Sequence, residues 1–494
     1  MLEKLSTPGP EILSVGEMIR AEQLAIGTGF TSLSLMEKAG NAVAEHIHNQ
    51  WSPRETLVLC GPGSNGGDGF VTAAALAQRG WPVRVCCLVD SSSLFGDAKE
   101  VSATWLGEVS PMGPEMISGA EIIIDAIFGA GLSRPISGVA LKTLEAANRS
   151  GKPIVAVDLP SGIDGDTGEL MGFAASCHST VTFFRPKRGH LLMPARRYIG
   201  ETIVKDIGIP EEVLEEISPK TFVNQPEYWE FEIPWPNLST HKFGRGHLVV
   251  VGSDKMTGAT RLAARAAMRI GAGLVTVLSP PSAVPIYSLD DPVLIVQPLR
   301  EDFNLSRDID DKRKNTALIG PGATIGEPTK FMLGQFMAEN VTTVIDGGAL
   351  SSFEDKPDEL FEMTRGNKAV MTPHEGEFSR LFNLKGNKIT RAAKAAVLSG
   401  AVVLLKGADS VIASPDGRIC LNNNGPSWLA TAGSGDVLAG AIAGLIAMGL
   451  PEFEATCVAV WVHGAAGSEF GPGLIASDLP ELFPKVLTDL YCLR

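Results

Sequence analysis

The chain has 494 residues, of which 44% are hydrophobic and 20% are charged, so a largely disordered protein is excluded and two or more domains are expected. Its 42 basic and 56 acidic side chains give a net charge of −14, which means that the molecule as a whole repels nucleic acids. The seven cysteines include no C-x-x-C pair, and this pattern indicates a reduced, cytoplasmic protein rather than a disulfide framework or a zinc site.

Neither the N-terminus nor the longest apolar run predicts export or membrane insertion. The first 14 residues lack the apolar core of a secretory signal. The longest apolar run, residues 437–450, contains three glycines and ends before Pro451. It is too short to cross a bilayer, so we expect a buried helix.

Apolar runs alternate with helix-like stretches between residues 55 and 209. This rhythm is typical of βα units on a mainly parallel sheet, so a three-layer α/β domain is expected. The expected strands are 56–60, 83–89, 122–128, 154–159 and 180–184.

A glycine-rich segment, residues 61–69, follows the first of these strands and precedes a helix. A loop of this kind presents backbone amides and the positive end of a helix to an anion such as a pyrophosphate. Asp68 would repel that anion unless its charge faces a ribose hydroxyl or a cation. The segment also satisfies G-x-G-x-x-G, and Asp90 follows a later strand, so a hydride-transferring Rossmann enzyme is one alternative. A plain tight turn is another.

Polar residues stand at the ends of several expected strands. Ligands of open α/β sheets bind beyond the carboxyl ends of the strands, so Asn65, Asp125, Asp158 and Ser161 are expected to converge on one crevice. One carboxylate with amide, hydroxyl and backbone oxygens favours a monovalent cation over magnesium or calcium. Each residue taken alone could equally be a cap or a turn former.

Four motifs in order, at residues 35–40, 64–70, 125–138 and 158–168, resemble the NAD(P)H-hydrate epimerase domain. The resemblance covers about residues 14–209 and implies a Rossmann-like fold, with potassium on Asn65, Asp125 and Ser161. It implies inversion at C6 of the hydrated nicotinamide ring, with Asp158 as our candidate acid or base. The substrate contacts that it implies are Ser64, Asn65, Gly66, Gly67, Asp68, Gly129, Ala130, Gly131, Leu132, Ser133, Arg134, Pro135 and Asp158. Ser64 departs from the family, which usually has asparagine there.

Residues 211–241 contain four prolines and many acidic residues, and their hydrophobic residues follow no regular spacing. This composition predicts a domain boundary. We expect domains at 1–214 and 222–494. A second alternation begins at His247. Its expected elements are strands at 247–253, 274–279, 316–320, 342–348, 369–374 and 401–407, a helix at 259–270, and a hairpin at 411–415 and 418–423.

Small residues and an aspartate open the apolar run of the second half. Such a helix start surrounds a developing negative charge with amide donors and places a carboxylate beside it. Gly433, Ser434 and Gly435 are therefore expected to form an anion hole, with Asp436 as the base, although Asp436 could be only an N-cap.

Segments 249–273, 320–323, 372–378, 405–410 and 432–436 together resemble the ADP-dependent NAD(P)H-hydrate dehydratase, a ribokinase-like domain. With both halves in this order, the chain resembles the bifunctional NAD(P)H-hydrate repair enzymes. The implied contacts to the hydrated dinucleotide are Ala259, Gly322, His374 and Asp436. The implied contacts to ADP or ATP are Lys406, Gly407, Ala408, Asp409, Ser410 and Gly435.

The resemblance implies that the nucleotide phosphorylates the hydrate, that Asp436 removes the hydroxyl proton, and that magnesium screens the phosphates. From chemistry alone, Lys406 could equally be a solvated strand end and His374 a structural hydrogen-bonding residue. Gly348 stands where the family usually has an acid and Pro426 where it has asparagine, so Asp346 is not assigned as a metal ligand.

Two other functions stay open. The second half could phosphorylate the hydroxyl of a vitamin with the first half regulating it, or the first half could only bind a dinucleotide or a protein. A homo-oligomer is expected, and the apolar residues 455–467 could form its surface or simply the core.

Overall fold

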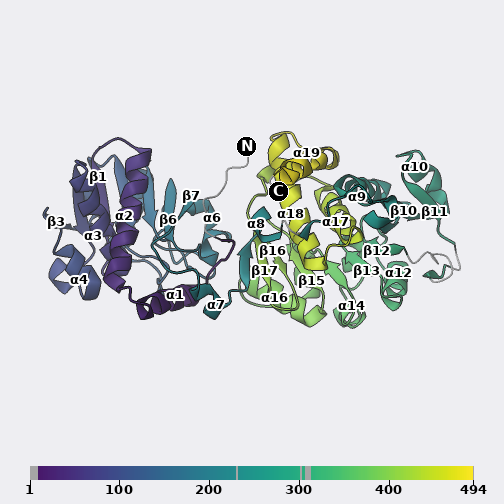
Figure 1. The fold of residues 1–494 in the computed structure, drawn as a ribbon, viewed down its shortest axis with the longest axis horizontal. Coiled ribbons are helices and arrows are strands. Elements are labelled where there is room, and N and C mark those ends of the chain that lie inside the picture. The colour runs from purple at the N-terminus through teal and green to yellow at the C-terminus, as the bar shows by residue number, and fades with distance from the viewer. Residues whose placement is uncertain (1–8, 230–231, 301–302, 306–312, 493–494) are drawn as a thin grey trace. The chain divides into compact units, whose positions relative to one another are not determined.

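The computed structural model describes residues 9–229, 232–300, 303–305 and 313–492. The chain divides into two compact units, Met1–Thr221 and Phe222–Arg494. Each unit is built around its own sheet (Figure 1).

The first unit contains a seven-stranded sheet in the order β3-β2-β1-β4-β5-β6-β7, in which every pair is parallel. The five expected strands are confirmed. The strands are β1 (Thr56–Cys60), β2 (Val83–Cys87), β3 (Val109–Pro111), β4 (Ile122–Ala126), β5 (Ile154–Val157), β6 (Ser179–Phe183) and β7 (Glu201–Lys205). The two edge strands were missed because β3 has only three residues and β7 is mostly not buried, so neither forms an apolar run.

Alternate side chains of β1 enter different cores, since successive residues of a strand point to opposite faces. Val58 and Cys60 pack with residues of α1, α2 and α3, whereas Leu57 and Leu59 pack with residues of α5. The fold is therefore the predicted three-layer α/β arrangement. The helices are α1 (Val15–Gly27), α2 (Ser32–Gln50), α3 (Ser64–Gln78), α4 (Gly96–Ser102), α5 (Gly138–Arg149), α6 (Arg196–Ile199) and α7 (Val213–Ile217).

The second unit contains a ten-stranded sheet in the order β11-β10-β9-β12-β13-β14-β15-β16-β17-β8. The pairs from β11 to β15 are parallel, and the pairs from β15 to β17 are antiparallel. The strands are β8 (Thr221–Val223), β9 (His247–Val251), β10 (Leu274–Ser279), β11 (Ile295–Pro298), β12 (Lys314–Ile319), β13 (Thr342–Ile345), β14 (Ala369–Met371), β15 (Val402–Leu405), β16 (Ser410–Ala413) and β17 (Ile419–Asn422). The expected hairpin is confirmed as β16 and β17, which turn at Gly417 with a φ of +92°.

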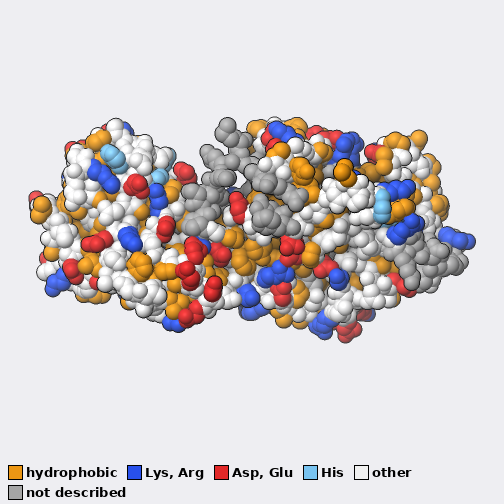
Figure 2. All heavy atoms as spheres, in the orientation of Figure 1, with side chains coloured by type: hydrophobic (Ala, Val, Ile, Leu, Met, Phe, Trp, Pro, Cys, Tyr) orange, Lys and Arg blue, Asp and Glu red, His pale blue; other side chains and the backbone are white. Residues whose placement is uncertain are grey.

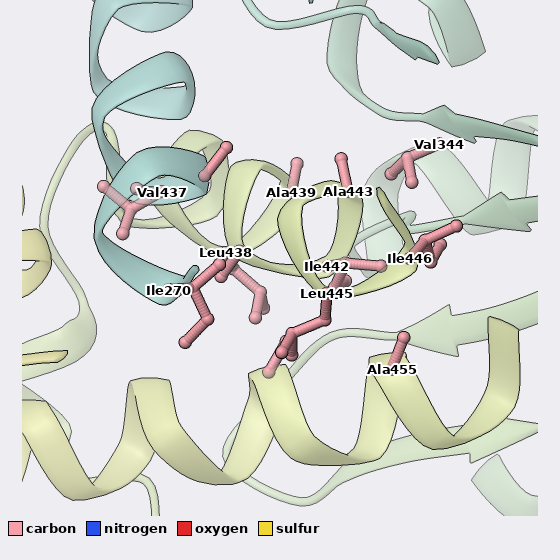
Figure 3. Close-up of a cluster of buried hydrophobic side chains, with 14 of the residues drawn as sticks. Ile270, Val344, Val437, Leu438, Ala439, Ile442, Ala443, Leu445, Ile446 and Ala455 are labelled. Carbon is pink, nitrogen blue, oxygen red and sulfur yellow. The ribbon is translucent and has the colours of Figure 1, made fainter. Parts of the chain in front are cut away.

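The predicted buried helix is α17 (Ser434–Ala447), and its apolar side chains pack against neighbouring helices and strands in the core of the second unit (Figure 3). Helix α17 packs closely against α9 (Thr257–Ile270), and glycine at position 440 permits this approach. A Cβ at Gly440 would overlap the Ala263 carbonyl oxygen. The other helices are α8 (Pro226–Trp229), α10 (Val284–Ser288), α12 (Glu327–Ala338), α13 (Gly347–Ser351), α14 (Pro357–Thr364), α15 (Glu375–Leu381), α16 (Lys388–Ser399), α18 (Glu452–Phe470) and α19 (Leu479–Tyr491).

Residues 455–467, which could have formed either a surface or the core, belong to α18 and are nearly all buried within this unit. They therefore form core. Figure 2 shows acidic and basic side chains interspersed over one face of the molecule. None of the helices in the described ranges has the length and apolar character needed to span a bilayer.

Candidate active sites

A cavity of about 460 Å³ lies in the first unit, beside α1, the start of α3 and the segment after β4. This is the carboxyl end of the parallel strands, where ligands of such sheets bind. Lining residues that the sequence predicted are Ser64, Asn65, Asp68, Gly129, Ala130, Gly131, Leu132, Ser133, Arg134 and Asp158.

The predicted glycine-rich loop is largely helical, because α3 already begins at Ser64. Gly66, Gly67 and Pro135 do not line the cavity. A Cβ at Gly66 would overlap the Gly61 carbonyl oxygen, and one at Gly67 would lie 2.5 Å from a methionine sulfur, so these glycines permit close packing. An anion can still meet the unpaired amides of the first helical turn.

Asp90, which suggested a ribose contact, is exposed and caps a short 3-10 helix outside the cavity lining. The structure therefore removes the acidic residue on which the hydride-transferring Rossmann alternative depended.

Asp158 lines the cavity directly after β5, with a φ of +65°. Its carboxylate accepts hydrogen bonds from the Ala130 N–H at 3.0 Å, the Thr182 hydroxyl at 2.9 Å and the Lys187 ammonium at 2.7 Å. Burial alone would raise the pKa of Asp158, but the Lys187 charge and the hydrogen bonds from Lys187 and the Ala130 N–H lower it to about 2. Asp158 is therefore an ionised contact near neutral pH, which fits a charge-stabilising role better than a proton-donating one.

Lys187 and His190 belong to this site, although the sequence reasoning missed both. Lys187 is only 2% exposed and also donates to the Thr182 hydroxyl at 2.9 Å. His190 Nδ1 accepts from the Lys187 N–H, and its Nε2 lies 2.8 Å from the Asp158 carbonyl oxygen. Burial lowers the pKa of His190 to about 4, so the ring is neutral and can donate to that oxygen. The available signal was a lysine shortly after the strand TVTFF, where site residues gather.

Lys187→Met is expected to lower the free energy of unfolding of the first unit by about 3 kcal/mol, because it leaves a buried carboxylate without its counter-charge. The pKa of Asp158 should rise as well. Lys205→Met removes a more exposed pair with Glu45 and should cost less than about 1 kcal/mol. Denaturant unfolding monitored by hydrogen exchange of β5 and β6 checks both values, and equal costs would contradict the assignment.

Asp125 and Ser161 lie behind the cavity lining and are fully buried. Ser161 donates to Asp125 from its N–H at 2.8 Å and from its hydroxyl at 2.6 Å, and its hydroxyl oxygen accepts from the Phe128 N–H at 2.8 Å. The side-chain amide of Asn65 is oriented so that its oxygen and its nitrogen both have partners. The oxygen accepts a hydrogen bond from the Gly129 N–H at 3.3 Å, and the nitrogen donates one to the Val157 carbonyl oxygen. The three predicted residues thus meet around one short segment after β4.

This oxygen-rich group fits a monovalent cation. Burial raises the pKa of Asp125, and no lysine, arginine or histidine of the described ranges forms an ion pair with it. A weakly charged cation would compensate that carboxylate. The described residues contain no group of three or more histidine, cysteine, aspartate and glutamate side chains arranged to hold a metal, so the set of oxygen donors is mostly neutral.

Asp436 lies in the first turn of α17, after Gly433 with its φ of +89°. The unpaired amides and positive end of the helix face this position. Burial and then Asp346 raise the pKa of Asp436 to about 6, with Lys406 opposing and Glu377 adding to the shift. A carboxyl group with this pKa is suited to accept a proton near neutral pH.

Lys406 follows β15 and donates from Nζ to Asp346 at 2.7 Å, and the same carboxylate oxygen accepts from the Thr372 hydroxyl at 2.7 Å. A Cβ at Gly435 would lie 3.4 Å from Lys406 Nζ. The structure therefore brings together three predicted residues, Lys406, Gly435 and Asp436. It also adds Asp346, which the sequence reasoning left unassigned.

The predicted nucleotide segment is the turn between β15 and β16. Gly407 and Ala408 are exposed, whereas Asp409 and Ser410 are buried. Ser410 closes the turn by bonding the Gly407 carbonyl at 2.8 Å. Asp409 pairs with Lys388 of α16 at 2.6 Å, so its carboxylate fixes the turn, and Lys388 is another residue that the sequence reasoning missed.

The segments that contain Ala259 and Gly322 lie side by side. The hydroxyl of Thr260, which follows Ala259, donates to the carbonyl of Pro321, which precedes Gly322, at 3.0 Å. His374 is the N-cap of α15, and its Nδ1 accepts from two backbone N–H groups of that helix, those of Gly376 and Glu377. Its side chain is 55% exposed. The structural role considered for His374 is thus present, and its Nε2 lies 3.6 Å from Glu377 Oε1.

The two residues that depart from the family pattern, Gly348 and Pro426, both lie against backbone or helix atoms of the second unit. A Cβ at Gly348 would overlap the Ala323 carbonyl oxygen, so an acidic side chain cannot enter there without a backbone shift. Pro426 precedes a short 3-10 helix and lies against Gly467 of α18. At the start of α17, His463 Nε2 lies 3.1 Å from the Ser434 hydroxyl, and burial lowers the pKa of His463 to about 4.

Two family models match the chain, YjeF-related protein N-terminus at residues 32–189 and NAD(P)H-hydrate dehydratase at residues 247–485. A bifunctional NAD(P)H-hydrate repair enzyme of Thermofilum pendens is 36% identical over 92% of each chain. The chain belongs to the family of bifunctional NAD(P)H-hydrate repair enzymes. The repair enzyme of Moorella thermoacetica is 34% identical over 97% of each chain.

Among solved structures, an ADP/ATP-dependent NAD(P)H-hydrate dehydratase of Bacillus subtilis, co-crystallised with ATP and Mg²⁺, is 27% identical with a TM-score of 0.48. It covers 54% of this repair-enzyme chain and 98% of its own. A ribokinase-like protein of Enterococcus faecalis is 23% identical with a TM-score of 0.49, over 55% of this chain and 96% of its own.

Proposed function

We propose that the chain repairs hydrated NADH and NADPH at two sites. The first domain, residues 1–214, interconverts the R and S hydrates, and the second, residues 222–494, uses ADP or ATP to dehydrate the S hydrate. The observation that carries this proposal is full-length similarity to the repair enzymes, in a chain whose two sheets each present an aspartate beside a helix N-terminus. Coupling the two steps also makes chemical sense, since a stereospecific dehydratase alone would strand one epimer.

In the first site the hydrated nicotinamide lies against Asp158. The other predicted residues that line the cavity, Ser64, Asn65, Asp68 and residues 129–134, hold the rest of the dinucleotide. Arg134 is an exposed cation on the cavity lining, which suits a phosphate. Asn65, Asp125 and Ser161 hold potassium, which supplies the positive charge that the buried carboxylate lacks.

In the second site Asp436 removes the proton of the hydrate hydroxyl, and the amides of Gly433, Ser434 and Gly435 stabilise the transferred phosphoryl group. Lys406 and the turn to Ser410 hold the adenine nucleotide. Ala259, Gly322 and His374 contact the hydrate. Magnesium, when bound, screens the nucleotide phosphates.

Homo-oligomers would form through surfaces other than α18, which is core. Apolar side chains stand exposed between α10 and the edge strand β11, among them Leu289 at 87% and Val293 at 70%. A cytoplasmic location follows for an enzyme that acts on cellular redox coenzymes.

The fate of the phosphoryl group separates this function from a vitamin kinase. With the S hydrate and either nucleotide, the full chain should release one inorganic phosphate for each NADH formed. A kinase would instead leave phosphate attached to an organic acceptor. A stable phosphorylated product without recovery of the 340 nm absorbance that reports NADH would refute the proposal.

A further inference from the structure

The cavity of the first unit contains a second buried carboxyl group, Asp68, which the proposed function uses only as a binding contact and not in the reaction. Asp68 is 9% exposed, lines the cavity and lies in the second turn of α3. In the described part of the chain no donor is hydrogen-bonded to its carboxyl oxygens, whereas Asp158 accepts three such bonds. A buried polar group without a partner beside a cavity is suited to bind a polar ligand atom.

Three charged groups act on Asp68 from different elements: Glu22 of α1, Asp158 after β5 and Lys187 after β6. Burial, then Asp158 and Glu22, raise the pKa of Asp68 well above its usual value, while Lys187 opposes them. The pKa values of the two aspartates of this cavity are thus shifted in opposite directions, that of Asp68 upward and that of Asp158 downward to about 2. Such a division commonly separates an acid from a charge-stabilising group.

We propose that Asp68 is the acid that protonates the departing hydroxyl at C6 of the hydrated nicotinamide. This inference rests on the proposed epimerase function. C6 is bonded to the ring nitrogen, so the nitrogen lone pair can form a C=N bond while the C6–O bond breaks. The electron pair of that bond leaves with the oxygen, which takes the Asp68 proton and departs as water.

The resulting ring is planar and positively charged at C6. A water molecule then adds to the opposite face and loses a proton to solvent, while the Asp68 carboxylate regains a proton from solvent, so the enzyme is regenerated and the configuration at C6 is inverted. Asp158, held ionised by Lys187 at 2.7 Å, stabilises the cation between the two steps. Asp68 is thus a catalytic residue, and Lys187 is a positioning residue.

Asp68→Asn tests this assignment in the full chain, with the pure R hydrate, no nucleotide, and separation of the two epimers over time. Epimerisation should fall at least about 100-fold toward the spontaneous rate, while the affinity for the hydrate is retained. Glu100→Gln, an exposed acid on α4, is the matched control and should behave as wild type. Wild-type rates in Asp68→Asn would overturn the inference. If wild type itself does not exceed the spontaneous rate, the proposed function fails instead.

Glu22→Gln provides a second test that does not depend on the stability of Asp68→Asn. Removing a negative neighbour lowers the pKa of Asp68, so the alkaline limb of the pH–rate profile should move to lower pH. A structural role for Asp68 would leave that limb in place, and an unmoved limb would contradict the assignment. In ¹⁸O-water each enzymatic inversion should also place one ¹⁸O at C6. Inversion without incorporation would contradict the water-loss route.

Discussion

Asp436→Asn is expected to lower the rate of dehydration about 1,000-fold while epimerisation continues at the wild-type rate. Asparagine keeps the shape of the side chain but cannot take the hydroxyl proton, and general-base catalysis typically contributes 100- to 10,000-fold. The free site holds Asp436 at a pKa of about 6. The base must be ionised to act, so wild-type dehydration should rise with pH through about 6.

Recovery of NADH absorbance from the S hydrate with ADP or ATP measures this effect. Glu362→Gln, an exposed acid of α14 in the same unit, is the control and should retain full dehydration. Dehydration by Asp436→Asn at more than a tenth of the wild-type rate would show that another group removes the proton.

Gly66→Ala is expected to abolish epimerisation and to destabilise the first unit by about 3 kcal/mol. The added Cβ would overlap the Gly61 carbonyl oxygen, which is main chain and cannot rotate away. The start of α3 must therefore move from the end of β1, and overpacking of this kind typically costs 1–3 kcal/mol or more. Dehydration should be unchanged because its residues belong to the other unit.

Gly63→Ala is the matched control for stability, since a Cβ there has nothing within 4 Å. It should change the free energy of unfolding by less than about 0.5 kcal/mol. Hydrogen exchange of peptides from β1 and α3 reports both values. If the two variants are equally stable, close packing is not the reason for glycine at position 66.

The sequence predicted the fold well where burial forces a simple pattern. Parallel strands covered on both faces are continuous apolar runs, so β1 and β4 to β6 were readily recognised, as was the buried helix α17. The helix start at Ser64 was missed because several glycines resemble a loop. Local composition does not reveal that Gly61 and Gly66 must approach each other closely.

Site residues that belong to a sequence motif were predicted. Site residues that are defined only by a partner distant in the sequence were missed. Lys187 lies 29 residues from Asp158 and Asp346 lies 60 residues from Lys406 in the sequence, so no local pattern links the partners. The protonation states depend on the same pairings. Neither the low pKa of Asp158 nor the raised pKa of Asp436 could be predicted before the neighbouring charges were placed.

The central claim, that one chain joins an epimerase to a dehydratase, is tested most directly by complete repair of a mixture of hydrates. Equal amounts of the R and S epimers with ADP or ATP should be converted fully to NADH by the wild-type chain, faster than the epimers exchange spontaneously. Gly66→Ala should recover the S half rapidly and the rest only at the spontaneous rate. If the wild-type chain also stops at half recovery, the account of two cooperating sites is contradicted.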